Sequence, residues 1–204
     1  MYITVLNINY DTMKEMDENI DYTNMNSIHQ WLTGRFHKSR KDAHILFKFI
    51  TMGKDLKVYI QSDDPFPAQN IEKAGAKLIS CFELPEVKAG DTILFRINCS
   101  ADKYVAGKKN SEFITDPNER VEWLKRKTDP AMEILNIQEL QKSRYISEKT
   151  DKKTGKLRKT KIQFIEYMGM ACVSDPESFM EMIHNGIGRF KNYGLGMLLY
   201  NVAS

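Results

Sequence analysis

The sequence predicts an α+β protein of two consecutive domains, each with the element order βαββαβ. Three observations predict this architecture. Short apolar, β-branched runs recur along the chain, apolar residues at helical spacing separate some of these runs, and a proline- and glycine-containing segment at 85–91 divides the chain in two. We therefore expect an N-terminal domain at residues 1–85 and a C-terminal domain at residues 91–204.

The first half begins and ends with a strand-like run. Its expected strands are 2–8, 44–51, 56–61 and 78–84. Between the first two runs, apolar residues recur at helical spacing and predict a helix that ends near residue 36. These residues are Met25, Ile28, Trp31, Leu32 and Phe36. A turn at 52–55 joins the middle strands, and a short helix is expected at 70–77.

The second half repeats this order of elements. Its expected strands include 92–98, 161–173 and 197–202. Asp116 and Asp175 each precede a proline and an acidic residue, which is typical of a helix start. Residues 131–147 are ambiguous, because helical spacing of apolar residues competes with a strand around 143–148. Both halves then match the ferredoxin-like, or RRM-like, unit in topology, although their sequences are not visibly alike.

The composition excludes several classes of protein. Apolar residues make up 42% and charged residues 28%, which suits a globular domain with a core and argues against extensive disorder. No apolar run approaches the roughly 20 residues that span a membrane, and the first residues do not resemble a signal peptide. Three widely spaced cysteines predict reduced thiols in the cytoplasm, and we expect no metal or other cofactor.

A glycine-rich stretch near the C-terminus could bind phosphate. Four of the eleven glycines lie within eleven residues, beginning with Gly186 and Gly188, and Arg189 and Lys191 lie among them. Backbone N–H groups in such a turn can form an anion-binding nest, to which the two cations add charge. The stretch follows a predicted helix and lacks the Lys-Ser/Thr of a mononucleotide-binding loop. A tight turn before an edge strand is the alternative interpretation.

A second candidate is a basic hairpin. Seven of the thirteen residues at 149–161 are Lys or Arg, and the run lies between two strands, so it would project as a rigid finger. Such a finger suits the phosphate-lined groove of an A-form duplex and would supply affinity without reading sequence. A solvated surface run is the alternative. The RNA-binding candidates here are Lys152, Lys153, Lys156, Arg158, Lys159 and Lys161, and further ones are Arg35, Lys108 and Lys109.

His29 is the candidate catalytic residue. It lies beside the apolar stripe of the first helix, and a basic segment at 35–41 follows it. An imidazole suits proton transfer at neutral pH without a metal, as general base toward a 2′-hydroxyl or as general acid toward a leaving 5′-oxygen. A structural role beside the core is the alternative. His37 is a second candidate, and His184 is expected to favour a helix C-terminus.

Several motifs together resemble the CasE family. They are I-H-Q-W-L at 28–32, Lys108-Lys109 ahead of D-P-N-E-R-V-E-W-L at 116–124, the basic hairpin, and G-I-G-R-F-K-N-Y-G-L-G-M-L at 186–198. CasE is the RNA-processing subunit of the type I-E CRISPR Cascade complex and a member of the RAMP superfamily. The resemblance extends over essentially the whole chain, and the terminal glycine pattern is its most specific part.

The resemblance implies a metal-independent endoribonuclease with two ferredoxin-like domains. Such enzymes cut precursor CRISPR RNA at the 3′ base of the repeat hairpin, leave 5′-hydroxyl and 2′,3′-cyclic phosphate ends, keep the hairpin and join other Cascade subunits. The family histidine corresponds to His29. The tyrosine that the family often has three residues earlier is Asn26 here, so catalytic support is expected from Asn26, His37 or Lys38.

Two other functions stay open from the sequence. The protein could be a non-catalytic subunit that only holds the repeat hairpin, or a pair of ferredoxin-like domains that acts as a protein–protein scaffold. Binding of hairpin RNA at low salt would exclude the scaffold, and cleavage would exclude the non-catalytic subunit.

Overall fold

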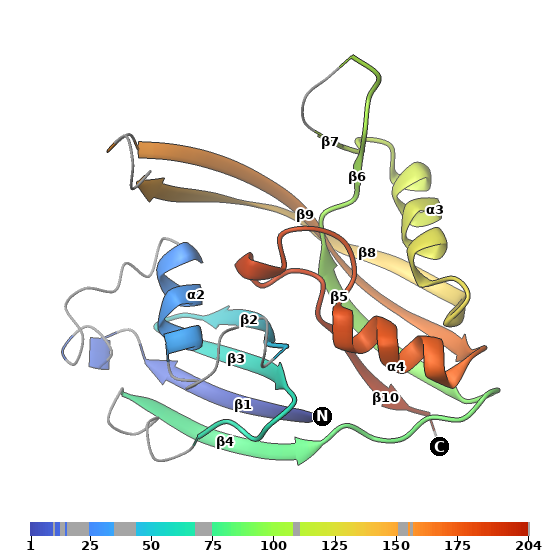
Figure 1. Cartoon of the computed structure of the whole chain (residues 1–204), viewed down its shortest axis with the longest axis horizontal. Coiled ribbons are helices and arrows are strands. Elements are labelled where there is room, and N and C mark those ends of the chain that lie inside the picture. The colour runs from blue at the N-terminus through green and yellow to red at the C-terminus, as the bar shows by residue number, and fades with distance from the viewer. Residues whose placement is uncertain are drawn as a thin grey trace. The chain divides into compact units, whose positions relative to one another are not determined.

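The computed structural model describes residues 1–9, 11–12, 15, 25–34, 44–67, 75–107, 111–150, 155 and 157–203, with the backbone alone at 25, 26, 149, 150 and 158. The chain divides into two compact units (Figure 1). The first comprises Met1–Leu84, Tyr145–Lys161 and Asn192–Gly194, and the second Pro85–Arg144, Ile162–Lys191 and Leu195–Ser204. No helix within the described residues is long and apolar enough to cross a membrane.

A four-stranded antiparallel sheet forms the first unit. Its strands are β1 (Tyr2–Asn9), β2 (Leu46–Met52), β3 (Asp55–Ser62) and β4 (Ala76–Glu83), in the spatial order β2-β3-β1-β4. Helix α2 (Met25–Gly34) buries Ile28, Trp31 and Leu32 against one face of this sheet. The apolar spacing that predicted the helix is therefore the stripe that packs on the sheet.

The expected helix at 70–77 lies mostly outside the described residues, which include neither 68–74 nor 35–43. At its end the prediction is wrong, because Ala76 and Lys77 belong to β4. Ala76 is buried and pairs with Ile8 of β1, so the ladder with β1 begins two residues before the predicted strand.

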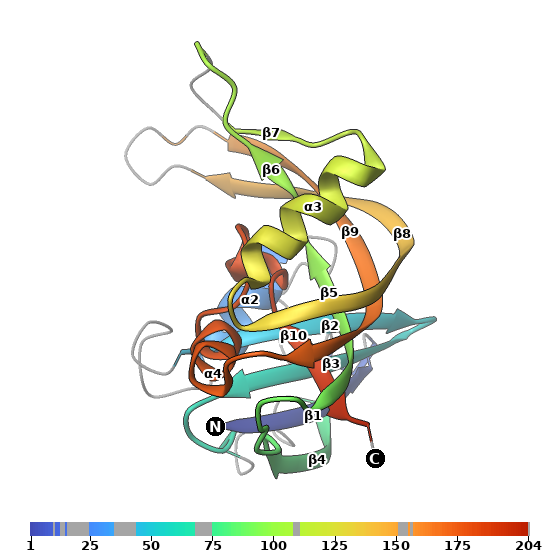
Figure 2. The same cartoon turned by 90° about the vertical axis from the view of Figure 1, so that its right-hand side faces the viewer.

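The second unit has the same topology. Its strands β5 (Thr92–Cys99), β8 (Met132–Thr150), β9 (Leu157–Val173) and β10 (Leu198–Val202) are ordered β10-β5-β9-β8. Helices α3 (Pro117–Thr128) and α4 (Pro176–Asn185) lie on one side of this sheet (Figures 1 and 2). A small ribbon, β6 (Asp102–Lys103) with β7 (Glu112–Phe113), precedes α3, and a short 3₁₀ helix, η3 (Lys191–Tyr193), precedes β10.

In both units the third strand in sequence lies between the first and the second, and the fourth pairs on the other side of the first. This is the strand order of the ferredoxin-like fold, so the predicted fold class, α+β with two ferredoxin-like domains, is confirmed.

The ambiguous segment at 131–147 is a strand. It forms most of β8, which is 19 residues long and pairs with β9. Leu135 and Leu140, which suggested a helix, are exposed. Their spacing therefore does not form a buried stripe, and the ladder with β9 decides the conformation instead.

The compact units differ from the predicted domain ranges in two segments. The outer part of the β8–β9 hairpin, Tyr145–Lys161, and Asn192–Gly194 in the glycine-rich stretch both group with the first unit. Strands β8 and β9 have 19 and 17 residues, about twice the eight of β5. Both strands therefore continue beyond the part of the sheet that contains β5. The ranges 1–85 and 91–204 themselves stay a prediction.

Candidate functional site

His29 lies on α2 between the buried residues of the helix and solvent. Its ring stacks on the buried ring of Phe47 in β2, with 5.9 Å between the ring centroids and 12° between the planes. The side chain is half-buried and its Nδ1 is shielded from solvent. Stacking on a core ring restricts the plane of the imidazole.

An aromatic group around Phe47 joins three parts of the chain. Phe49 of β2 stacks on Tyr145 of β8 at 5.6 Å between centroids. Phe49, Tyr145 and Tyr193 all pack against the buried cluster that contains Phe47. The first unit thus brings together the helix of His29, the base of the basic hairpin and the end of the glycine-rich stretch. Nothing in the sequence signals this grouping, because it depends on contacts about 100 residues apart.

Gly194 lies against two of these rings. A Cβ at this position would lie 2.9 Å from Cε1 of Phe49 and 3.0 Å from Cε2 of Phe47. Its φ of +79° is also strained for any residue with a side chain. Gly194 therefore lets the backbone of the glycine-rich stretch rest on the ring that supports His29.

In the second unit, backbone hydrogen bonds join the two ends of the glycine-rich stretch. The N–H of Ile187 donates to the carbonyl of Gly196 at 2.8 Å, and the N–H of Gly196 donates to the carbonyl of Asn98 at 2.7 Å. A Cβ on Gly196 would lie 2.4 Å from the carbonyl oxygen of Ile187. The loop is thereby fixed to the end of β5. Its glycines Gly186 and Gly188 have φ of +69° and +78°, as the predicted turn requires.

Arg189 projects from this loop at the surface. Its guanidinium donates to the Ser111 hydroxyl and lies 5.3 Å from the centre of the Phe190 ring. Lys191, at the start of η3, is half-buried. The structure therefore places Gly186, Gly188, Arg189 and Lys191 along one loop.

A cleft of about 810 Å³ opens beside this loop in the second unit. Its wall includes parts of α3 and α4, the loop at Gly188 and Arg189, and Asp102 with Tyr104. Burial raises the pKa of the Asp102 carboxyl above its ordinary value, while the nearby Ser100 and Arg189 act in the opposite direction. Neither Asp102 nor Tyr104 was a candidate from the sequence, because no motif contains them.

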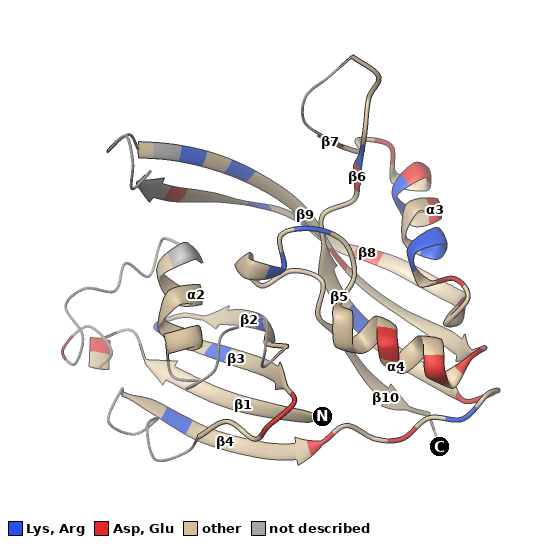
Figure 3. Cartoon of the chain, viewed as in Figure 1, with Lys and Arg blue, Asp and Glu red and all other residues tan. Residues whose placement is uncertain are grey.

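The basic hairpin is described only in part. Lys159 and Lys161 belong to β9, and both are exposed. Figure 3 shows blue Lys and Arg positions along the part of β9 next to the hairpin end. Lys159 pairs with Glu148 of β8 at 2.5 Å. Lys152, Lys153 and Lys156 lie outside the described residues, and of Arg158 only the backbone is described.

Other candidates also lie beyond what the structure describes. Arg35, His37, Lys38, Lys108 and Lys109 are outside the described residues, and of Asn26 only the backbone in α2 is described. The RNA contacts predicted for these residues therefore stay predictions.

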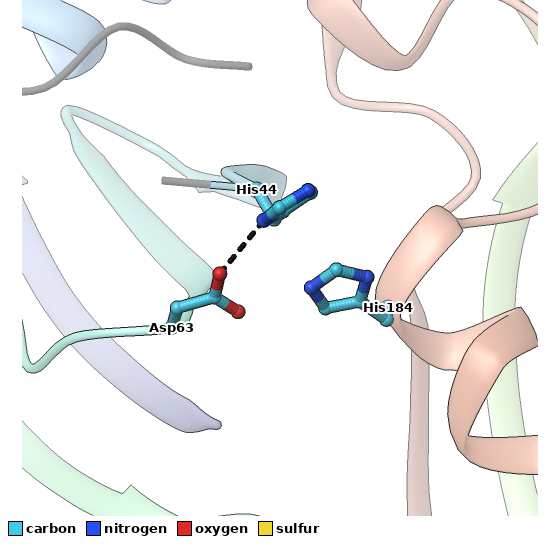
Figure 4. A group of neighbouring side chains, drawn as sticks. All are labelled: His44, Asp63 and His184. Atoms are coloured by element: carbon cyan, nitrogen blue, oxygen red, sulfur yellow. Dashed lines mark hydrogen bonds and ion pairs between the residues drawn. The ribbon is translucent and has the colours of Figure 1, made fainter. Parts of the chain in front are cut away.

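Two further histidines are described. His184 lies in the last turn of α4, where the sequence placed it (Figure 4). His44, which the sequence did not single out, has its Nδ1 2.7 Å from Oδ2 of Asp63 (Figure 4). His44 has a φ of +45°, uncommon for a residue other than glycine.

Known proteins match this chain in both sequence and fold. Residues 1–201 match the model of a family described as CRISPR associated protein. The chain is 28% identical over 126 residues to the CRISPR-associated endoribonuclease Cse3 of Thermus thermophilus. This alignment covers 56% of the chain and 57% of that protein, so it spans little more than half the length of the curated relative.

Solved structures match over nearly the full length. CRISPR endoribonuclease Cse3 bound to a 19-nucleotide RNA has a TM-score of 0.84 at 20% identity, covering 98% of this chain and 100% of that one. A chain of a CRISPR RNA-guided surveillance complex has a TM-score of 0.75 at 17% identity, with both chains covered completely. With the family match over residues 1–201, the resemblance to CasE is confirmed, and the chain belongs to the family of CRISPR associated proteins.

Proposed function

We propose that this protein is an endoribonuclease that cleaves precursor CRISPR RNA at the 3′ base of the repeat hairpin and retains the product. Its partners would be the repeat hairpin RNA and other Cascade subunits in the cytoplasm. The family match over residues 1–201 carries the proposal. The endoribonuclease activity of the relative Cse3, and the likeness to its RNA-bound form and to a chain of a surveillance complex, support it.

His29 is the proposed catalytic residue. The 2′-hydroxyl of the nucleotide before the cut attacks the adjacent phosphorus, and the bond from phosphorus to the 5′-oxygen breaks. Nε2 of His29 either takes the proton of the 2′-hydroxyl or gives one to the departing 5′-oxygen, and water exchanges the other proton, so the 2′-oxygen loses one proton and the 5′-oxygen gains one. The products carry a 2′,3′-cyclic phosphate and a 5′-hydroxyl. The half-buried ring and its fixed plane on Phe47 support this role.

Basic side chains would bind the RNA and offset charge on the phosphoryl oxygens. The described ones are Lys159 and Lys161 on the hairpin and Arg189 and Lys191 in the glycine-rich loop. This reaction needs no metal, since the imidazole moves the proton and cations stabilise the charge. His37, Lys38 and Asn26 remain the proposed sources of catalytic support.

The test is cleavage of a cognate repeat RNA in EDTA by the wild-type protein and by His29→Ala. We expect the wild type to cut in EDTA and the variant to lose about 100-fold or more in rate, the usual contribution of a general acid or base. A 2′-deoxy nucleotide before the cut should block the reaction. Loss of cutting in EDTA, or a variant that cuts at the wild-type rate, would refute the mechanism.

Asn26, where the family often has a tyrosine, favours a second possibility, a non-catalytic subunit that holds the repeat hairpin. Such a protein would bind the hairpin tightly and salt-dependently yet form no product after long incubation. Replacement of Asn26 by tyrosine distinguishes the enzyme from the non-catalytic subunit. If the protein is an enzyme that lacks a second catalytic residue, the tyrosine should raise its cleavage rate. If the protein only binds the hairpin, it should stay inactive.

A further inference from the structure

The cleft of the second unit has the size and lining of a ligand site. Its volume of about 810 Å³ falls within the roughly 300–1,000 Å³ typical of small-molecule sites. Cationic side chains outnumber acidic ones along its wall, five to three. The glycine-rich loop forms one side, so the backbone comes close to the cleft where side chains are absent. A ligand with negative charge and a flat apolar part would suit this wall.

Tyr104 supplies an aromatic surface at the cleft. It is 80% exposed, the largest exposed fraction among the large hydrophobic residues that the structure describes. Its neighbours Asp102 and Lys103 are held in the ribbon of β6 and β7, and Lys103 is tied to Glu119 of α3 at 2.6 Å. An exposed ring on an anchored segment is the arrangement on which unpaired bases of RNA stack.

Asp102 adds an acceptor to the same wall. It is half-buried, and its Oδ2 is shielded from solvent and accepts no hydrogen bond from the part of the chain that the structure describes. A shielded acceptor without a donor costs free energy, which a ligand N–H would recover. Arg189 lies near enough to Asp102 to lower its pKa. Its side chain is exposed, so it can turn toward a phosphate.

We propose that this cleft binds one unpaired nucleotide of the RNA, with its base on Tyr104, the Watson–Crick edge of the base toward Asp102 and its phosphate at Arg189. The inference rests on the proposed RNA substrate but adds a site that is separate from the hairpin and from His29. Guanine is the base that fits, because it presents two adjacent N–H donors to a carboxylate, which only accepts. The nucleotide lies in the single-stranded RNA beside the repeat hairpin, since a paired base would keep its faces stacked.

Binding of two RNAs tests this site: the repeat hairpin alone, and the hairpin with its unpaired flanking nucleotides. Tyr104→Ala should weaken binding of the flanked RNA roughly tenfold, since one base stacked on an aromatic ring contributes about that much or more. The same variant should bind the bare hairpin like the wild type. Tyr104→Phe is the matched control, which keeps the ring and should match the wild type on both RNAs.

Abasic substitutions then locate the nucleotide. At one flanking position, removal of the base should abolish the difference between wild type and Tyr104→Ala, whereas at the others the difference should persist. With each base in turn at that position, the wild type should bind guanine best, and Asp102→Asn should lose this preference. An unchanged ranking in Asp102→Asn would overturn the assignment of Asp102.

The outcomes separate this site from the proposed function. If Tyr104→Ala binds both RNAs like the wild type, or weakens both equally, the nucleotide site is wrong while hairpin binding and cleavage stand. If the wild type binds and retains the flanked RNA but does not cut it, the catalytic proposal fails and the nucleotide site is still judged by binding. If the wild type binds neither RNA, both proposals fail.

Discussion

At the scale of single residues, the catalytic proposal depends on what holds His29 in place. The imidazole stacks on Phe47, and Gly194 lies against the rings of Phe47 and Phe49. Gly194 is thus a residue of the glycine-rich stretch whose role is packing, whereas Gly188 and Arg189 line the cleft. The stretch that the sequence marks as one motif therefore has two parts with different surroundings in the structure.

Gly194→Ala should destabilise the first unit. The new Cβ adds overpacking against two rings to backbone strain at positive φ, together about 2–4 kcal/mol. Urea unfolding followed by the fluorescence of Trp31 measures this, in a Trp123→Phe background that removes the other tryptophan. Gly53→Ala is the control, because Gly53 also has a positive φ but faces open space, and it should cost only about 1–2 kcal/mol. Equal losses in the two variants would contradict the packing role.

At the scale of elements, a buried ion pair ties α3 to β8. Arg120 is 4% exposed, and its guanidinium binds both carboxylate oxygens of Glu139, at 2.8 and 2.5 Å. Glu139 raises the pKa of Arg120 above its ordinary value, chiefly through these hydrogen bonds. The guanidinium also donates to the carbonyl of Thr115, just before the helix. The start of α3 is thereby held against the sheet, beside the ribbon that leads to Tyr104.

Arg120→Ala should lose about 3 kcal/mol of stability, because Glu139 would stay half-buried without a cation, with the Tyr167 hydroxyl still donating to it. Unfolding followed by Trp123 fluorescence in a Trp31→Phe background reports on the second unit. Lys125→Ala is the control on the same helix. Lys125 pairs with Glu122 at the surface, and its removal should change stability by no more than about 0.5 kcal/mol. A loss in Arg120→Ala as small as in the control would show that the pair does not anchor α3.

At the scale of the whole molecule, charge is distributed unevenly. The net charge is only +3, yet seven of thirteen residues at 149–161 are cationic. Association with RNA should therefore depend on a local cluster rather than on the total charge. Lys159 and Lys161 are the described members of that cluster with placed side chains.

The salt dependence of hairpin binding tests this distribution. Lys159→Ala with Lys161→Ala should reduce the slope of log affinity against log salt by about 1–2, since each phosphate contact contributes nearly 1. Lys88→Ala, an exposed lysine outside the cluster, should leave the slope unchanged. If the double variant keeps the wild-type slope, these two lysines do not contact phosphates.

The sequence by itself determined what depends on neighbouring residues. Asp116 and Asp175 cap α3 and α4 as predicted, because a cap needs only a side chain and the N–H groups two or three positions later. Apolar, β-branched runs and helical spacing likewise located α2 and most of the strands, although not β8, and the fold class followed from their order. The family motifs marked His29 and the glycine-rich stretch.

The tertiary structure alone decided what depends on residues far apart. The support of His29 needs Phe47, Phe49 and Gly194 to meet, and no local pattern encodes a contact across about 150 residues. Apolar residues in 131–147 have helical spacing, yet most of this segment forms β8 because it hydrogen-bonds to β9. The nucleotide cleft joins Tyr104 to the glycine-rich loop in the same way. Long-range packing selects among the conformations that local propensity leaves open, since most of the burial that stabilises them is non-local.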